Sequence, residues 1–300
     1  MTKGESDEQG VLDIRAYEKL PEAETMDLPK DLRAKMDDDV YECFKDKGFF
    51  TFRLKNYEGK ANPIELISER DITYFGQYRT VESGIRVKEG RGFFVDQKKH
   101  FYVGYFKNGS LNGPGVMIIP KKNYFKGIWV DNNMTGFGLY SSGEALYYEG
   151  DWVNSLQEGY GEEHWPDKSY YKGHFKKGMK NGNGEFHWVM EGTVYKGEFM
   201  DNKINGKGEY SWKDGKRYIG EWNQEKMDGH GRFEWPDGRY YEGGYRNDKK
   251  EGYGLFVWPD KKRYEGNWHN GNQEGEGIFY DKDGKSSKGV WRAGKKIKDA

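Results

Sequence analysis

The sequence predicts an all-β fold, an elongated single-layer antiparallel sheet of stacked β-hairpins with a non-repeat N-terminal arm. Three observations carry this prediction. A pentad Tyr-x-Gly-x-aromatic recurs at a nearly fixed interval, each interval contains two stretches of alternating polarity, and the 300 residues combine 17% aromatic residues with 43 glycines. A fixed internal period of roughly 20–50 residues marks a repeat architecture, and alternation with period two marks strands.

The pentad sets the register of the array. Copies are 23 residues apart, except for one step of 24, and they begin at Tyr102, Phe125, Tyr148, Tyr171, Tyr195, Tyr218, Tyr241 and Tyr264. The repeat therefore explains the tyrosine, glycine and tryptophan residues of these copies as structural residues, before any role in binding is considered.

Residues 148–171 show how one copy is expected to fold. Alternation predicts a first strand over 148–152, a turn over 154–158, a second strand over 159–165 and a turn at Pro166-Asp167. This makes one β-hairpin per copy. The pentad glycines share the face of the aromatic residues, where we expect them to leave room for neighbouring rings.

The aromatic residue that ends each pentad forms a second column. Stacked hairpins would align both columns into ladders stabilised by cross-strand pairs. The second column comprises Trp129, Trp152, Phe175, Phe199, Trp222, Tyr245, Trp268 and Trp291. With the eight residues that begin the pentads, it is the predicted structural aromatic ladder.

Two irregularities in spacing locate turns. The 24-residue step coincides with an extra residue within 188–192, and a pentad at Tyr74 precedes Tyr102 by 28 residues, which implies a five-residue insertion within 81–89. Insertions in turns preserve the register of the strands. We therefore expect nine repeats from Tyr74 to about residue 286, as the spacing of such arrays implies, and a closing half-repeat at 287–291.

This division gives three segments: an acidic arm at 1–40, a capping segment at 41–73 and the repeat array at 74–300. The arm holds 12 acidic and 6 basic residues, so it carries −6 and the remaining 260 residues carry +5. We expect the arm to be disordered alone and to order on a partner, with a short helix within 31–47. Aromatic residues of the capping segment would cover the open edge of the first hairpin.

Composition excludes several classes of protein. The single cysteine, Cys43, rules out an intramolecular disulfide framework and a cysteine zinc cluster. No run of 18 apolar residues predicts a membrane span, and the N-terminus lacks a signal-peptide pattern, so a cytosolic protein is expected. The net charge of −1 does not suggest nucleic-acid binding.

The repeat resembles the MORN repeat (membrane occupation and recognition nexus). Residues 218–222 (YIGEW), 229–231 (GHG) and 235–238 (WPDG) match the pattern of that family closely. The resemblance implies hairpins stacked into one twisted, grooved sheet. It implies no single function, because MORN arrays occur in ciliary radial-spoke heads, apicomplexan cytoskeletal rings, junctional membrane-tethering proteins and extensions of lipid kinases or methyltransferases.

No constellation of residues indicates chemistry. The recurring Gly-x-Gly lacks the Lys-Ser/Thr of phosphate loops and the third glycine of dinucleotide sites. His164 and His187 occupy equivalent outward positions, but a metal site would need further ligands, so they are interpreted as surface histidines. We predict that the chain is not an enzyme and has no catalytic residue, no cofactor and no metal ligand.

Two surfaces remain as candidates for binding. A single-layer sheet leaves its aromatic face uncovered, and a helix or extended segment would fit along it. The turns before each pentad share an edge and form a broken basic ridge, which is either solvated or in contact with anionic partners such as tubulin tails or lipid headgroups. The ridge comprises Lys98, Lys99, Lys121, Lys122, Lys216, Arg217, Arg239, Lys261, Lys262 and Arg263.

These features predict a non-catalytic scaffold subunit that binds other proteins in a large assembly. Analogy with the family favours a cytoplasmic, cytoskeleton-associated location in the axoneme of a cilium or flagellum, as in a radial-spoke head. The expected partners are other subunits, including a second MORN protein or a homodimer mate, and acidic surfaces. The alternative is a membrane-surface adaptor that binds anionic lipids through the basic ridge, although no lipidation motif or basic amphipathic helix supports it.

Overall fold

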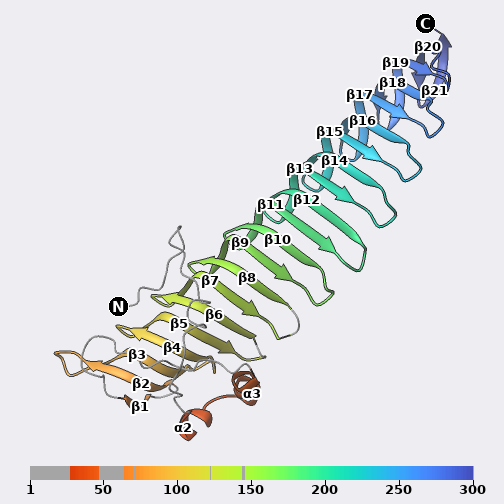
Figure 1. Ribbon diagram of the computed structural model, residues 1–300. Coiled ribbons are helices and arrows are strands. Elements are labelled where there is room, and N and C mark those ends of the chain that lie inside the picture. The colour runs from red at the N-terminus through yellow and green to blue at the C-terminus, as the bar shows by residue number, and fades with distance from the viewer. Residues whose placement is uncertain (1–27, 47–63, 70–71, 122, 144–145, 300) are drawn as a thin grey trace. The chain divides into compact units, whose positions relative to one another are not determined.

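The computed structural model describes residues 28–46, 64–69, 72–121, 123–143 and 146–299 (Figure 1). This part of the chain is almost wholly β, and consecutive strands within each of its two compact units pair antiparallel in a single layer. The units are Met1–Pro166 and Asp167–Ala300. The prediction of an all-β sheet of consecutive hairpins is confirmed.

The described residues of the first unit form two helices and nine strands. The helices are α2 (Lys30–Arg33) and α3 (Asp38–Asp46). The strands are β1 (Ile64–Glu69), β2 (Ile72–Thr80), β3 (Arg86–Val95), β4 (Phe101–Lys107), β5 (Ser110–Ile119), β6 (Asn123–Val130), β7 (Asn133–Ser141), β8 (Tyr147–Val153) and β9 (Leu156–His164).

The described residues of the second unit form twelve strands. They are β10 (Tyr170–Lys176), β11 (Met179–Trp188), β12 (Thr193–Met200), β13 (Lys203–Ser211), β14 (Arg217–Asn223), β15 (Lys226–Glu234), β16 (Tyr240–Arg246), β17 (Lys249–Val257), β18 (Arg263–His269), β19 (Asn272–Tyr280), β20 (Ser286–Arg292) and β21 (Lys295–Asp299).

Each repeat is a hairpin whose register is set by facing glycines and a bulge. Gly150 of β8 faces Gly161 of β9, and the register then shifts so that Trp152 faces Gln157. Asn154 and Ser155 close the hairpin at positive φ, 49° and 62°, which suits the right-handed twist of the strands. The predicted turn over 154–158 is therefore wrong, because β9 already begins at Leu156. The irregularity of the hairpin lies in the bulge between Gly150 and Trp152 and not in the turn.

A buried tyrosine lies over each pair of facing glycines. The Tyr218 hydroxyl donates a hydrogen bond to the Glu221 carbonyl at 3.0 Å, and a Cβ added at Gly231 would lie 2.2 Å from that hydroxyl oxygen. The same hydrogen bond, to the carbonyl three residues ahead, is made by Tyr102, Tyr148, Tyr171, Tyr195, Tyr241 and Tyr264. The prediction that these glycines leave room for rings is confirmed.

The aromatic residue that ends the pentad joins neighbouring repeats. The Tyr195 ring meets Trp222 of the next repeat edge to face, with centroids 5.8 Å apart, and the Trp222 Nε1 donates a hydrogen bond to the Gly208 carbonyl at 3.3 Å. Aromatic pairs of this kind contribute about 0.5–1.5 kcal/mol beyond the area they bury. The indole bond to the preceding repeat recurs at Trp129, Trp152 and Trp268.

One copy keeps the packing without the hydroxyl. Phe125 stands where the other copies have tyrosine, and it is half-buried. Met134 is 1% exposed, and its sulfur lies 3.0 Å from the position of a Cβ on Gly127. A flexible thioether therefore occupies space that the tyrosine side chain fills elsewhere.

The spacing irregularities fall in turns, as predicted. Residues 81–85 connect β2 to β3, and residues 189–192 connect β11 to β12. The β2–β3 hairpin has the same register as the later copies, with Gly76 facing Gly92, so the repeat at Tyr74 has the expected form. The array extends beyond the expected limits, because β1 pairs with β2, and β21 follows the predicted half-repeat and pairs with β20.

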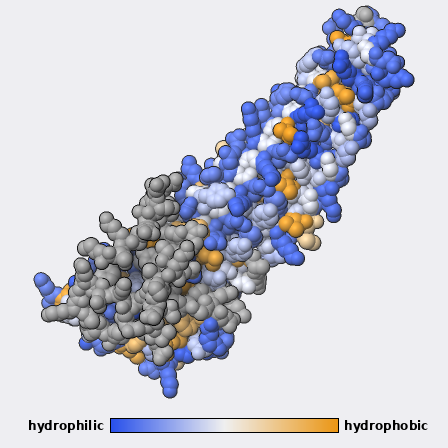
Figure 2. Space-filling view, in the orientation of Figure 1, coloured by the Kyte–Doolittle hydropathy of each residue, from blue (hydrophilic) through white to orange (hydrophobic). Residues whose placement is uncertain are grey.

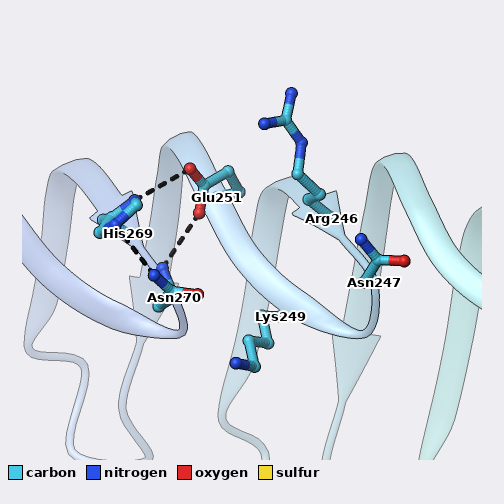
Figure 3. A pocket seen from close by; sticks show the side chains of 6 residues that line it. All are labelled: Arg246, Asn247, Lys249, Glu251, His269 and Asn270. Carbon is cyan, nitrogen blue, oxygen red and sulfur yellow. Dashed lines mark hydrogen bonds and ion pairs between the residues drawn. The ribbon is translucent and has the colours of Figure 1, made fainter.

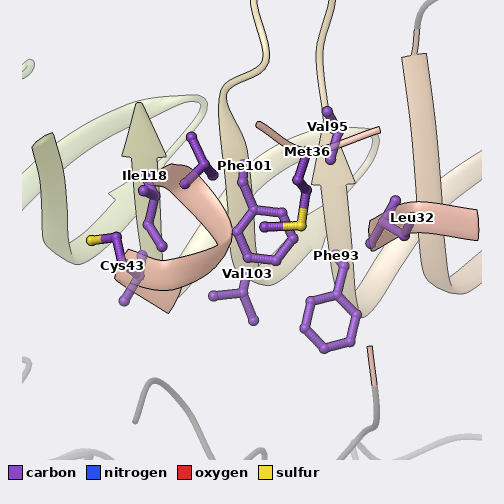
Figure 4. Packing of buried hydrophobic residues seen from close by; sticks show 10 residues of the cluster. Leu32, Met36, Cys43, Phe93, Val95, Phe101, Val103 and Ile118 are labelled. Atoms are coloured by element: carbon purple, nitrogen blue, oxygen red, sulfur yellow. The ribbon is translucent and has the colours of Figure 1, made fainter. Parts of the chain in front are cut away.

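The sheet of the first unit is covered on the face opposite the tyrosines, here called the reverse face. Its buried residues there are Phe93, Val95, Phe101, Val103, Val116 and Ile118, and the helical segment adds Leu32, Met36, Val40 and Cys43 (Figure 4). The Phe44 ring meets Phe101 edge to face at 5.2 Å. Strands β3–β5 are therefore buried on both faces, whereas a bare single layer was expected.

The helical segment differs from the single helix expected within 31–47. The chain turns at 34–37, so that Met36 points into the buried cluster, and an ion pair of 2.6 Å joins Arg33 to Asp38 across the turn. Residues 28–40 of the expected arm thus lie on the chain's own sheet. Residues 1–27, and the aromatic residues expected to cap the array within 47–63, lie outside the described residues.

Substitutions at one tyrosine and its glycine test the packing of the repeat. Tyr218→Phe should lower the free energy of unfolding by about 1 kcal/mol, because the Glu221 carbonyl loses its donor. Gly231→Ala should cost about 3 kcal/mol, because the ring must move. Urea denaturation measures both, with Tyr253→Phe as control, since Tyr253 is 61% exposed and donates to the Glu265 carboxylate. Equal effects of the two tyrosine substitutions would contradict the proposed role of the hydroxyl.

The single cysteine reports on the helical cover. Leu32 is 0% exposed, so Leu32→Ala should cost about 3 kcal/mol and loosen the segment that buries Cys43. We expect a thiol reagent to react with Cys43 markedly faster in Leu32→Ala than in the unchanged protein or in the control Val153→Ala, whose site is 49% exposed. An unchanged rate would show that the helices do not depend on this packing.

Candidate functional site

A line of aromatic rings runs along the tyrosine face of the second unit. The rings stand two and four residues after the second glycine of each hairpin, and consecutive rings have centroids 4.2 to 6.1 Å apart. All are half-buried except Phe256, which is buried. This ring line comprises Phe186, Trp188, Tyr210, Trp212, Phe233, Trp235, Phe256, Trp258 and Phe279.

The predicted structural ladder is packed more deeply than the ring line. Fifteen of its sixteen residues are at most 7% exposed, and the remaining one, Phe125, is half-buried. Burial raises the pKa of Tyr264 to about 12, which keeps its hydroxyl protonated as a donor to the Asn267 carbonyl. A partner on this face would therefore meet the ring line, whose residues were not among the sites predicted from the sequence.

A lysine lies within the ring line. The Lys250 Nζ is 4.6 Å from the centroid of Phe256, 4.7 Å from Trp268, 5.1 Å from Tyr241 and 5.5 Å from Trp235. Cations at such distances are attracted to the faces of aromatic rings. Burial, with a smaller contribution from the positive charge of Arg239, nevertheless lowers the pKa of Lys250 to about 8.

The position of Lys250 does not require a cation. It faces the last aromatic residue of the pentad, Tyr245, across the hairpin. Six other copies have an uncharged residue at this position, namely Leu111, Met134, Gln157, Ile204, Met227 and Gln273. Three copies have a lysine there, namely Lys88, Lys180 and Lys296. The lysines that recur at this position are the sequence signal that could have indicated a cation among the rings.

The reverse face of the second unit is charged and internally paired. Arg232 reaches Glu234 at 2.7 Å and Glu242 at 3.1 Å, and Lys196 reaches Glu185 at 3.0 Å. In the view of Figure 2, hydrophilic residues cover most of the C-terminal strands, and hydrophobic residues form small separate groups. Exposed ion pairs of this kind contribute little stability, so they mark a solvated surface.

In the first unit, two residues of the predicted basic ridge hold the helical segment. The Lys99 Nζ donates a hydrogen bond to the Lys35 carbonyl at 3.2 Å, and the backbone N–H of Lys121 donates to the Asp39 carboxylate. Lys98 is exposed in the same turn as Lys99, and Lys122 lies outside the described residues.

In the second unit, most residues of the ridge have partners. The turn aspartates Asp214, Asp237 and Asp260 pair with Lys216, Arg239 and Lys262 at 2.7, 3.2 and 2.8 Å. Hydrogen bonds from Lys216 and Lys262 lower the pKa of Asp214 and of Asp260. Arg217 pairs with Glu209 and Glu234, Arg263 lies 4.0 Å from the Tyr280 ring, and Lys261 is exposed. Acidic side chains of the turns and of neighbouring strands therefore neutralise most of the positive charge of the ridge in the second unit.

Each of the two histidines considered as ligands is held by a glutamate and a tyrosine. His164 pairs with Glu162 at 2.6 Å and stacks on Tyr147, and His187 pairs with Glu185 and stacks on Tyr170. Among the residues that the structure describes, no group of three or more His, Cys, Asp or Glu side chains could hold a metal ion. Likewise, no described helix is long and apolar enough to cross a membrane.

A shallow pocket of about 310 Å³ lies between two hairpin turns and is lined by Arg246, Asn247, Lys249, Glu251, His269 and Asn270 (Figure 3). Glu251 accepts hydrogen bonds from the His269 ring and from the Asn270 backbone N–H, both at 3.0 Å. Glu89 and Glu274 accept the equivalent backbone bonds, from Asn108 and Ala293. The carboxylate of this pocket is therefore a recurring cap of the next hairpin turn.

The pH dependence of stability tests the cost of burying Lys250. Below about pH 8 the ammonium is charged in the folded and unfolded chains, so the cost is present in full, and it disappears as the pH rises toward 10.5, the ordinary value. Lys250→Met should therefore stabilise the protein by about 1–3 kcal/mol at pH 7, a gain that shrinks above pH 8.

Denaturation between pH 7 and 10.5 measures this difference. Gln273→Met at the equivalent position is the control, because glutamine does not titrate in this range. If the gain from Lys250→Met were constant over this pH range, burial of the charge would not be its cause.

Comparison with solved structures finds low overall similarity. The TCP domain of SAS-4 (dCPAP) from Drosophila melanogaster, in complex with a proline-rich motif of Ana2 (dSTIL), is 13% identical, with 47% of this chain and 84% of that chain covered and a TM-score of 0.28. The TCP10 domain of Danio rerio CPAP, in complex with a peptide of STIL, is 16% identical, with 70% and 95% covered and a TM-score of 0.28. A streptogramin B lyase is 10% identical, with 79% and 85% covered and a TM-score of 0.14. Such scores carry no functional implication.

No curated protein matches the sequence significantly. The family model described as MORN repeat, in contrast, matches eight consecutive segments. They are residues 102–124, 125–143, 148–170, 171–193, 195–217, 218–238, 241–263 and 264–286. These segments cover more than half of the chain and coincide with the hairpins that carry the buried tyrosines or Phe125, so the chain belongs to the MORN-repeat family.

Proposed function

We propose that this chain is a non-catalytic scaffold subunit that binds protein partners along the ring line of its second unit. The observation that carries the proposal is the continuous row of nine aromatic rings, eight of them half-buried, on one face of a single-layer sheet. Contiguous apolar surface that stays partly accessible on a folded protein is typical of a site of interaction.

The repeat lattice suits the ring line to binding. Aromatic side chains offer a large contact area, and rings that are already fixed lose little conformational freedom when a partner docks. The ring-line residue Tyr210 contacts both the buried Tyr195, at 6.4 Å, and Trp222, at 5.9 Å. The packing of the repeats thus fixes the separations of the rings, and an apolar segment of a partner would meet a preformed surface.

Within this function, we favour a subunit of a ciliary axonemal complex such as a radial-spoke head. This assignment rests on analogy with the family. It places the chain in the cytoplasm, associated with the cytoskeleton of a cilium or flagellum. A second MORN protein or a second copy of this chain would be among the partners. Crosslinking mass spectrometry on the native assembly tests it, and recovery of the chain as an isolated monomer would oppose it.

Substitution of two rings tests where partners bind. Trp212→Ser with Trp235→Ser should reduce retention of copurifying partners at least about tenfold, because the centre of interfaces built on aromatic anchors carries most of their binding energy. Partner retention is measured by quantitative mass spectrometry after affinity isolation, with circular dichroism to check folding. Tyr253→Ser, at an exposed reverse-face position, is the control. Loss of partners in the control, but not in the tryptophan variant, would place the interface on the reverse face.

The alternative is a membrane-surface adaptor that uses the basic ridge. The ion pairs of Lys216 and Lys262 with turn aspartates weigh against it, because these two bases are already neutralised. Sedimentation with vesicles that contain or lack phosphoinositides separates the two functions. We expect no binding in either case, and binding that requires phosphoinositides would favour the adaptor.

A further inference from the structure

We propose that Lys250 and Arg239 form a binding site for a carboxylate of the partner segment that docks on the ring line. The preferred partner is then a protein segment in which an acidic residue stands among apolar residues. This inference rests on the proposed function and names the chemistry of the partner at the same site.

Two cations share one ring of the ring line. The guanidinium carbon of Arg239 lies 5.0 Å from the centroid of Trp235, and the Lys250 Nζ lies 5.5 Å from the same centroid. The Lys250 Nζ is also surrounded by Phe256, Trp268 and Tyr241. The Lys250 ammonium therefore lies among rings, where water solvates it incompletely, and the Arg239 side chain beside it is 43% exposed.

These cations have spare capacity for an anion. Among the described residues, no carboxylate lies within ion-pair distance of the Lys250 Nζ. Arg239 pairs with Asp237 at 3.2 Å through its buried Nε, but this contact lacks the geometry of a hydrogen bond. Buried or half-buried charges without a full set of partners destabilise a protein, and a carboxylate that bonds to both groups would relieve this cost.

Lysine recurs at this position of the hairpin, as Lys88, Lys180 and Lys296, but the fold does not require it. The equivalent position holds methionine in the preceding repeat (Met227) and glutamine in the next (Gln273), so the hairpin forms without a cation there. A charge that the lattice does not need, placed in the candidate interface, indicates a role in recognition.

The surroundings favour a peptide over a membrane or a free anion. Apolar rings flank the two cations, with Trp212 and Phe233 before Trp235 and Trp258 after Phe256 along the ring line. An occupant must therefore present apolar groups beside its anion. A lipid surface would instead be drawn to exposed bases, and those of the turns are largely paired.

Matched peptides provide the test. The probes are fluorescein-labelled 12-residue peptides drawn from an array of apolar sequences, each made with Glu, Gln or Lys at one central position. Fluorescence anisotropy with the full chain measures Kd near physiological salt. We expect the Glu peptides that bind to do so at least about tenfold more tightly than their Gln partners, as for a charge-assisted pair. The Lys peptides should bind most weakly.

The advantage of Glu over Gln should fall to less than about twofold in Lys250→Met, because the anion then loses its main cation. Methionine occupies the equivalent position 227, so this variant should fold. Lys249→Met, an identical change at the adjacent exposed turn, is the control and should keep the full advantage.

Each other outcome overturns the inference. Equal binding of Glu and Gln peptides, or an advantage that survives both Lys250→Met and Arg239→Gln, refutes the carboxylate site. If the carboxylate site is refuted in this way but Trp235→Ser abolishes binding of both peptides, the proposed function of the ring line is supported and only the carboxylate site fails. If no peptide binds, the ring line is not a docking surface and both proposals fail. Binding of phosphatidylserine vesicles that depends on Lys250 would identify a membrane as the occupant.

Discussion

The packing of a tyrosine ring over two facing glycines is the interaction on which the rest of the structure depends. At Tyr218 the ring lies where the Cβ atoms of Gly220 and Gly231 would be, and its hydroxyl holds the carbonyl exposed by the bulge. This contact fixes the register inside a repeat. The same ring meets Tyr245 of the next repeat edge to face at 5.2 Å, so it also sets the separation of neighbours. Because each repeat supports its neighbour, this local contact orders the run of repeats within each unit.

The two faces of the sheet serve different purposes as a result. On the tyrosine face, the residues of the ladder are buried between repeats. The rings of the ring line stay half-buried and form a row of preformed contacts. On the reverse face, the first unit buries Phe101 and Val103 under α2 and α3, whereas the second unit carries paired charges such as Arg232 and Glu242. Function is therefore proposed for the face on which rings are both fixed and accessible. Lys250 lies there among the rings, at a position where other copies carry either a lysine or an uncharged residue.

Much of this fold could be predicted from the sequence, because a repeat shows its register in its spacing. The turns at 81–85 and 189–192 follow from two irregular steps. The early start of β9 could not be predicted, because the bulge between Gly150 and Trp152 leaves the alternation of residue types unchanged. The helical cover of the first unit could have been predicted from two apolar runs, residues 101–103 (FYV) and 116–119 (VMII). A strand that is apolar on both faces is expected to be buried on both faces. Which rings stay exposed depends on side-chain packing, which spacing does not encode.

Hydroxyl-radical footprinting of the native assembly, compared with the isolated chain, tests the central claim most directly. It measures oxidation of individual side chains and so separates the two faces of a single-layer sheet. Docking along the ring line predicts that Trp188, Trp212, Trp235 and Trp258 are oxidised in the isolated chain and protected in the assembly, while Tyr253 on the reverse face reacts equally in both. Equal oxidation of the four tryptophans in the two samples would contradict the account.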